Sequence, residues 1–245
     1  MSRRRGLDPA QRTLTADQAA RAIYIDFERR KDQPPALLGV VYAEGRRHVD
    51  EERVVLRQDI VEPALEPVAG SVELVDDGSF YRYDTESTSL RHSLRTIVQR
   101  AVAQDRLIVS WSCFDRDRVV EYGELDDATL HAFHRRFRNG IATARRWRRR
   151  VQPDLVFEWE TFGGSNKLSR YFELIEFAVP GRYGTGLVAE NIRRVQAGLE
   201  KQQTFAKLTP SQQRAWRDVL EHNRYDCVGL RQVVTRAAGE LAAVS

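Results

Sequence analysis

The sequence predicts an α/β fold in which helices flank one mixed central sheet, and two observations support this. Three segments rich in β-branched, aromatic and aliphatic residues lie near the N-terminus, separated only by short turns that contain proline or glycine. Strands joined by short turns pair antiparallel, so the first three strands should form an antiparallel meander. Further along the chain, segments with a helical period alternate with another buried strand.

The N-terminal half contains the predicted meander. We expect the first strand over residues 22–28, the second over 36–42 after a proline turn, and the third within 48–56. Residues 57–86 contain several prolines and glycines that interrupt long elements, and they predict a loop with short strands. A helix over about 89–104 follows, because its apolar residues have the helical period and serine or threonine can cap it.

The remaining elements are mostly helical. We expect a buried strand over 106–111, and residues 116–122 form the beginning of another helix. The other expected elements are a helix from Asp126 to about Arg150, an extended segment over 154–159, and helices over about 167–178, 188–203 and from Thr209 to the end, with a possible break near His222.

The domain organisation follows from this order. Residues 1–20 read as a basic N-terminal arm, and residues 21–245 as one domain without an internal repeat or a clear linker. Three strands, a helix, a strand and a helix, followed by more helices, is the order of the RNase H-like fold. The sequence therefore predicts a single RNase H-like domain behind a short arm.

Composition limits the class of protein. The formal net charge is +4, and only four of the 39 basic residues are lysine. Arginine suits phosphate recognition, but a biased base composition of the genome explains its abundance equally well. No apolar run approaches the roughly 18 residues of a membrane span, and no apolar core follows the first arginines as in a secretory signal. Two cysteines fit a reducing cytoplasm, where we expect the protein.

Two acidic residues at the end of the first strand are the first candidates for chemistry. Side chains alternate between the faces of a strand, so Asp26 and Glu28 lie on one face, about 7 Å apart. Two carboxylates on a largely apolar strand repel each other and lose hydration, which a divalent cation would compensate. Ion pairs with Arg29 and Arg30 at an exposed strand end are an equally good explanation.

Two further acids complete a pattern. Phe114-Asp115 follows the strand that ends near residue 111, and Asp226 lies in the last helix within His222-Asn223-Arg224-Tyr225-Asp226-Cys227. Together with Asp26-Phe27-Glu28, this pattern resembles the three motifs of the DEDD superfamily of 3′-to-5′ exonucleases, which have the RNase H-like fold. The last motif is closest to that of the bacterial YprB-type domains, and the resemblance covers about residues 20–238.

The resemblance implies phosphodiester cleavage with two divalent cations, Mg²⁺ or Mn²⁺, about 4 Å apart. Asp26 would bridge both ions, Glu28 and Asp226 would complete the first ion's ligands, and Asp115 would reach the second. Asp117 is the alternative to Asp115, although the phenylalanine before Asp115 favours the latter. The expected substrates are single-stranded DNA or RNA, or frayed 3′ ends, and the sequence does not choose between DNA and RNA.

His222 departs from the family pattern. It stands four residues before Asp226, where one branch of the superfamily has a tyrosine that positions the attacking water. Residues four apart share a helix face, so His222 should approach the same site as Asp226 and act as a general base. The alternative is a surface histidine on a feeble or inactive protein.

A cluster near residue 147 is a weaker candidate for nucleic-acid binding. Arg145, Arg146 and Arg148 would follow a phosphate backbone while Trp147 stacks on a base, although a solvated basic helix face explains them more simply. Two rival functions also stay open: a non-catalytic nucleic-acid-binding module with this fold, and an unrelated α/β protein whose acids form structural salt bridges.

Overall fold

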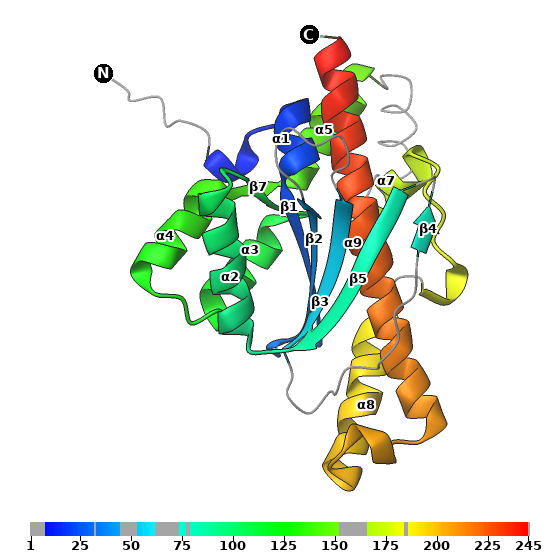
Figure 1. Cartoon of the computed structure of the whole chain (residues 1–245). Coiled ribbons are helices and arrows are strands. Elements are labelled where there is room, and N and C mark those ends of the chain that lie inside the picture. Colours follow the sequence, from blue (N-terminus) through cyan, green and yellow to red (C-terminus); the bar gives the residue numbers. More distant parts are fainter. Residues whose placement is uncertain are drawn as a thin grey trace.

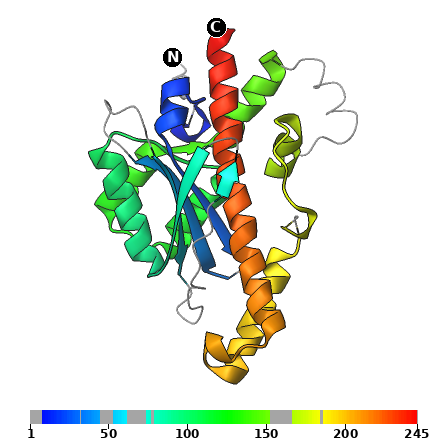
Figure 2. The same ribbon diagram turned by 45° about the vertical axis from the view of Figure 1, so that its right-hand side comes forward.

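The computed structural model describes residues 8–31, 33–44, 53–61, 74–76, 79–151, 166–183 and 186–244. They form an open mixed sheet with helices on both of its faces, as Figures 1 and 2 show. The predicted α/β class with helices flanking a mixed sheet is therefore confirmed.

The sheet has the strand order β4-β5-β3-β2-β1-β6-β7. Its centre is the predicted antiparallel meander, in which β2 pairs antiparallel with both β1 and β3. β6 lies parallel to β1 on the other side, and β7 lies parallel to β6. The bounds of these strands are Ile23–Arg29 for β1, Pro35–Glu44 for β2, Arg53–Ile60 for β3, Ile108–Ser110 for β6 and Phe137–Asn139 for β7.

The region over 57–86, predicted as a loop with short strands, contains longer strands than expected. β3 continues to Ile60, and a hairpin of β4 (Leu74–Asp76) and β5 (Ser79–Ser87) follows. β5 pairs parallel with β3 along its length, from Val54↔Tyr81 to Ile60↔Ser87. Prolines and glycines earlier in this region suggested a loop, but the run from Ser79 contains the aromatic and β-branched residues that strands favour.

The two faces of the sheet carry different helices. α2 (Leu90–Ala103), α3 (Cys113–Tyr122) and α4 (Asp127–Arg136) lie on one face (Figure 1). The other face is crossed by α9 (Pro210–Ala243), which contacts α1 (Ala16–Arg21), α5 (Gly140–Val151), α7 (Leu168–Leu174) and α8 (Val188–Gln202). Alternation along β1 separates the two cores, because Ile23, Ile25 and Phe27 join the first face whereas Tyr24 joins the second.

α9 is one uninterrupted helix of 34 residues. It begins as predicted at Thr209-Pro210, where Thr209 and Gln212 form a capping box. The break expected near His222 is wrong, because no proline interrupts the helix and residues 222–224 are buried. α9 packs directly on β1, β2 and β3, so its central turns lie over the strand that carries Asp26 and Glu28.

The helix predicted from Asp126 to Arg150 is two helices separated by β7. Phe137 is fully buried and pairs with Ile108 of β6, so the chain extends for three residues before α5 begins. The arginine-rich stretch therefore starts a new helix on the other face of the sheet. The extended segment expected over 154–159 lies outside the described residues.

Three predicted helices agree closely with the structure, and a fourth is shorter. Helices over 90–103, 188–202 and 210–243 match their predictions, whereas α7 ends at Leu174 rather than near 178. Within the described residues, no helix combines the length and apolar character needed to cross a membrane.

The predicted N-terminal arm is packed on the domain from Asp8 onward. A 3-10 turn, η1 (Pro9–Gln11), precedes α1, and Ala10, Leu14 and Ala19 are buried. The backbone N–H of Leu14 donates to Thr143 Oγ1 of α5 at 3.0 Å. This part of residues 1–20 belongs to the core rather than to a loose extension.

Candidate metal centre

Three elements that are distant in the sequence place acidic side chains together. β1 presents Asp26 and Glu28 to the face covered by α9, and α9 contributes His222 and Asp226. α3 begins directly after β6 and carries Asp115 in its first turn. The site therefore forms where β1, the exit of β6 and the middle of α9 meet.

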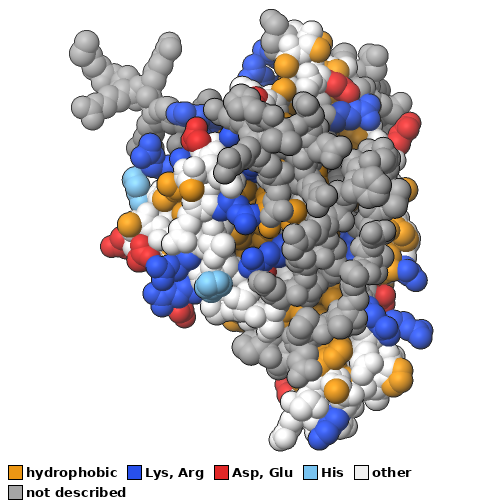
Figure 3. All heavy atoms as spheres, in the orientation of Figure 1, with side chains coloured by type: hydrophobic (Ala, Val, Ile, Leu, Met, Phe, Trp, Pro, Cys, Tyr) orange, Lys and Arg blue, Asp and Glu red, His pale blue; other side chains and the backbone are white. Residues whose placement is uncertain are grey.

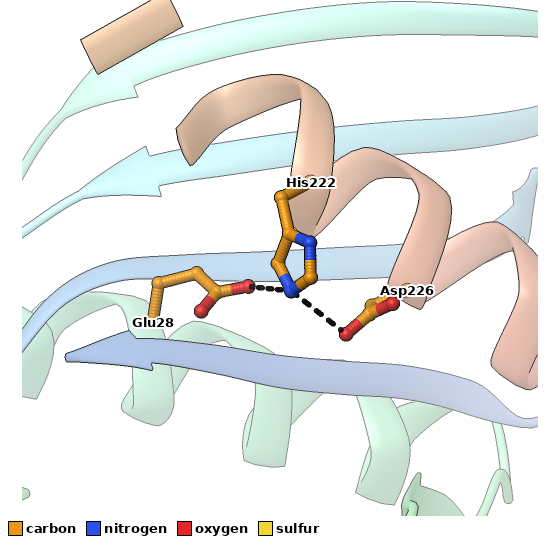
Figure 4. Close-up of side chains that lie close together, drawn as sticks. All are labelled: Glu28, His222 and Asp226. Atoms are coloured by element: carbon orange, nitrogen blue, oxygen red, sulfur yellow. Dashed lines mark ion pairs between the residues drawn. The ribbon is translucent and has the colours of Figure 1, made fainter. Parts of the chain in front are cut away.

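Glu28, His222 and Asp226 form the centre of this site (Figure 4). His222 Nε2 lies 3.3 Å from Asp226 Oδ2 and 3.8 Å from Glu28 Oε1, between the two carboxylates. One ligand atom from each residue lies within 4.8 Å of the others. Carboxylate oxygens and an imidazole nitrogen are ordinary ligands of divalent metals, so this group can hold a metal ion.

The orientation of the His222 ring is fixed by a hydrogen bond at Nδ1, the ring nitrogen that does not face the carboxylates. Nδ1 lies 2.5 Å from the carbonyl oxygen of Tyr183, at the end of the 3-10 turn η2 (Gly181–Tyr183). A carbonyl only accepts, so Nδ1 donates its proton there and Nε2 faces the carboxylates. His222 is 8% exposed, so the alternative of a surface histidine is wrong.

Burial and crowding change the protonation of these groups. Burial raises the pKa of Glu28 to about 8, with Asp226 adding to the increase and His222 opposing it. Burial lowers the pKa of His222, but its hydrogen bond and charge interaction with Asp226, together with Glu28, raise it by more, to about 9. Without a metal, a protonated His222 thus supplies positive charge between the carboxylates.

Asp26 lies beside this group and is held by an amide. Asn223 Nδ2 donates to Asp26 Oδ2 at 3.0 Å. Burial raises the pKa of Asp26 well above its ordinary value, and the charges of Glu28, Asp226 and Asp115 raise it further. Four carboxyl groups therefore influence one another here, which is the arrangement that a bound cation relieves.

The structure distinguishes Asp115 from its alternative, Asp117. Asp115 is 8% exposed, and its burial raises its pKa to about 6 although hydrogen bonds from the Ser110 side chain and the Ser112 backbone lower it. The side chain of Asp117 is 57% exposed and lies 3.3 Å from the guanidinium of Arg116. The charge of Asp115 also raises the pKa of Asp26, so Asp115, and not Asp117, is the acid close to the other carboxylates.

The salt bridges considered for the end of β1 are not found among the described residues. Arg29 Nη1 donates to the carbonyl of Arg30, and Arg30 Nη1 donates to Gln196 Oε1. The Arg29 guanidinium also lies 4.6 Å from the ring centre of Phe114, which is exposed beside Asp115. Neither arginine neutralises Glu28 by an ion pair in the described part of the chain.

The predicted nucleic-acid cluster on α5 is wrong in part. Trp147 is fully buried and donates from Nε1 to Glu240 at 2.6 Å, so it cannot stack on a base. Arg148 is also buried, 3.3 Å from the hydroxyl of Tyr171, whereas Arg145 and Arg146 are exposed. Figure 3 shows separate groups of Lys and Arg side chains on the described part of one face of the molecule.

Residue-by-residue reading of the sequence missed the amides and the glycine around Asp26. Asn223 lies within the last motif, but the motif predicts no role for it, and Gln58 lies in a segment predicted as a loop with short strands. Gly39 is directly opposite Asp26 in the β1–β2 pairing. The strand register, had it been known, would have placed Gly39 and Gln58 in one row with Asp26, whereas Asn223 reaches Asp26 only through the packing of α9 on the sheet.

Comparisons of the chain with protein-family models, with curated proteins and with solved structures found no match.

Proposed function

We propose that this protein is a metal-dependent nuclease with an RNase H-like fold, which removes nucleotides from the 3′ ends of single-stranded DNA or RNA. The observation that carries the proposal is the group of Glu28, His222 and Asp226, beside which Asp26 and Asp115 lie close enough for their charges to interact. In the described residues none of these four acids forms an ion pair with lysine or arginine. Structural salt bridges, the rival explanation, would need such partners.

The topology supports the fold assignment. Three antiparallel strands are followed by a helix and then by a strand that pairs parallel with β1. The added β4–β5 hairpin at one edge of the sheet is a departure from the simple element order. It lies beyond β3 and leaves the arrangement of β1, β6 and α9 around the carboxylates unaltered.

The donor set suits hard divalent cations. Carboxylate oxygens are preferred by Mg²⁺ and Mn²⁺, which retain several waters and need few protein ligands. When bound, a pair of such ions would activate water and stabilise the departing 3′ oxygen. Asp26, Glu28 and Asp226 would hold one ion and Asp115 would help to hold the other, with Asp26 shared between them.

His222 can serve this site in two ways. Its Nε2 can accept a proton from an attacking water, or it can be a metal ligand beside Glu28 and Asp226. An imidazole ligand would favour Mn²⁺ over Mg²⁺, because nitrogen ligands suit transition metals better than magnesium. The relative affinity for the two ions separates these roles.

A nuclease assay tests the proposal directly. The purified protein is incubated with matched DNA and RNA oligonucleotides, labelled at the 5′ end, in Mg²⁺, in Mn²⁺ and in EDTA. We expect a ladder of products shortened one nucleotide at a time from the 3′ end, in metal only, and its loss in Asp26→Asn.

The other outcomes separate the rivals. Metal-induced stabilisation and oligonucleotide binding without cleavage would indicate a non-catalytic module. Cleavage that survives in Asp26→Asn would refute the site. A parent protein that binds no metal and cleaves no oligonucleotide would refute the function.

A further inference from the structure

We propose that Gln58 and Asn223 are positioning residues that orient Asp26 through a relay of side-chain amides, an inference that rests on the proposed metal-binding role of Asp26. Both amides are fully buried. Gln58 lies on β3 and Asn223 on α9, so the relay joins the sheet to the helix that covers it.

Hydrogen bonds define the direction of the relay. Gln58 Nε2 donates to the backbone carbonyl of Leu220 and to Asn223 Oδ1, both at 2.8 Å. Asn223 Nδ2 then donates to Asp26 Oδ2 at 3.0 Å, and it lies 3.4 Å from the backbone carbonyl of Asp26. Every link therefore has one donor and one acceptor.

The backbone carbonyl of Leu220 sets this direction. A carbonyl only accepts hydrogen bonds, so Gln58 must turn its NH₂ group, not its oxygen, toward α9. With that NH₂ facing Asn223 Oδ1, Asn223 has only its own NH₂ left for Asp26. A reversed Asn223 would place its oxygen against the Asp26 carboxylate and its NH₂ against that of Gln58, two repulsive contacts in a buried site.

The relay holds a carboxylate without neutralising it. Asn223 Nδ2 contacts both the side chain and the backbone of Asp26, which restrains the carboxylate relative to β1. A lysine or arginine in this place would also orient Asp26, but its charge would oppose the binding of a cation. An amide donor gives orientation and leaves the negative charge for the metal.

Gly39 provides the space in which the relay crosses the sheet. It pairs with Asp26 on one side and with Gln58 on the other, so the three residues form one row across β1, β2 and β3. A Cβ at Gly39 would lie 2.3 Å from Asn223 Oδ1 and 2.4 Å from Cys227 Sγ. Any other residue here would push Asn223 away from Gln58 and Asp26.

Manganese binding by the full chain tests the positioning role. Gln58→Glu is nearly isosteric but removes the NH₂ group, and Gln58→Met is a second variant without charge in case the first fails to fold. We expect calorimetric titration with Mn²⁺ to show affinity reduced about tenfold to a hundredfold in either variant. Thermal unfolding in EDTA shows in parallel that each variant is folded.

Thr143→Val is the matched control. It also removes a buried hydrogen bond, the one that Leu14 donates to Thr143, but on α5. We expect it to lower the unfolding temperature in EDTA and to retain the parent's affinity for Mn²⁺. If the Gln58 variants behave like this control, with unchanged Mn²⁺ affinity, the positioning role is refuted.

A double-mutant cycle in EDTA tests the relay without metal. Gln58→Met, Asp26→Ala and the double variant are compared by denaturant unfolding. Gln58 reaches Asp26 through Asn223, so the relay predicts that Gln58→Met shifts the unfolding midpoint less in the Asp26→Ala background. Additive shifts would refute the relay. A parent that binds no Mn²⁺ would instead refute the metal site, while this cycle would still decide whether the amides are coupled to Asp26.

Discussion

At the scale of single residues, the protonation state of His222 is coupled to metal binding at the site. Its ring lies between Glu28 and Asp226, and the Tyr183 carbonyl holds Nδ1. The raised pKa of about 9 describes the metal-free protein, in which His222 is the positive partner of the carboxylates. A cation bound there would repel that proton, so metal binding and the basicity of Nε2 are coupled.

Asp115 and Asp117 allow a matched comparison. They are two residues apart in the sequence, but only Asp115 is buried at the site, whereas Asp117 is exposed beside Arg116. We expect Asp115→Asn to reduce metal-dependent cleavage at least about a hundredfold, as loss of a group that orients the reaction does. Asp117→Asn should cleave at the parent rate under the same conditions. Equal losses in the two variants would show that Asp115 has no special role.

Substitutions of His222 test its place at the reaction centre. We expect His222→Phe to slow cleavage about a hundredfold or more, and His222→Tyr to keep appreciable activity. If Nε2 acts as the base, excess Mn²⁺ leaves the defect of His222→Phe unchanged. If Nε2 is a ligand, Mn²⁺ affinity falls as well and added Mn²⁺ partly restores the rate. Cleavage by His222→Phe at the parent rate at every pH would exclude both roles.

At the scale of elements, Trp147 packs α5 against α9 and is not exposed on the surface of α5. The indole is fully buried against α9 and donates to Glu240. We expect Trp147→Ala to lower the free energy of unfolding by about 3–5 kcal/mol, as large-to-small changes of buried aromatic residues do. Chemical denaturation measures this loss. A folded Trp147→Ala protein that bound oligonucleotides more weakly than an Arg145→Ala protein would contradict the purely structural role.

The contact between β2 and α9 depends on one glycine. A methyl group at Gly39 would overlap Asn223 and Cys227, so we expect Gly39→Ala to destabilise the protein by about 1–3 kcal/mol and to weaken Mn²⁺ binding. Gly239→Ala, in α9 itself and with open space around it, is the control. It should be neutral or stabilising by about 0.5–1 kcal/mol, because alanine favours helices over glycine. Thermal unfolding with and without Mn²⁺ measures both effects.

At the scale of the whole molecule, the stability of the metal-free protein should fall as pH rises, and the stabilisation by bound metal should grow. Glu28 and Asp115 have raised pKa values of about 8 and 6 in the folded state, so the folded protein binds more protons than the unfolded chain between about pH 4 and 8. Stability therefore falls as pH rises through this range. His222, with its pKa raised to about 9, adds stability below its ordinary pKa that is likewise lost as pH rises to 9.

Thermal unfolding from pH 5 to pH 9 checks this. In EDTA we expect the unfolding temperature to fall with rising pH. Other titrating groups of the protein also contribute, and because Asp26→Asn contains the same groups, its comparison with the parent removes their contribution. In Mn²⁺ the difference between the metal and EDTA curves should widen with pH, because the cation competes with protons for the same ligands. A difference that stays constant with pH would contradict binding at these carboxylates.

Local sequence patterns were sufficient for most helices and for β1 and β2, whereas the third strand, predicted within 48–56, is Arg53–Ile60. Alternation along residues 23–29 put Asp26 and Glu28 on one face, and the four-residue spacing put His222 and Asp226 on one side of a helix. The start of α9 followed from Thr209-Pro210. These features depend on residues that are neighbours along the chain, so their sequence alone determined them.

Only the tertiary structure decided the features that depend on distant partners. β7 and β5 exist because Phe137 pairs with Ile108 and residues 81–87 pair with β3, and both pairings override local signals for helix or loop. The burial of Trp147, the choice of Asp115 over Asp117 and the relay from Gln58 through Asn223 to Asp26 likewise require β3, α3, α5 and α9 in their final positions. Spacing within one segment carries no information about which distant segment will face it, and that contact determines whether a side chain is a core residue, a solvated one or part of the site.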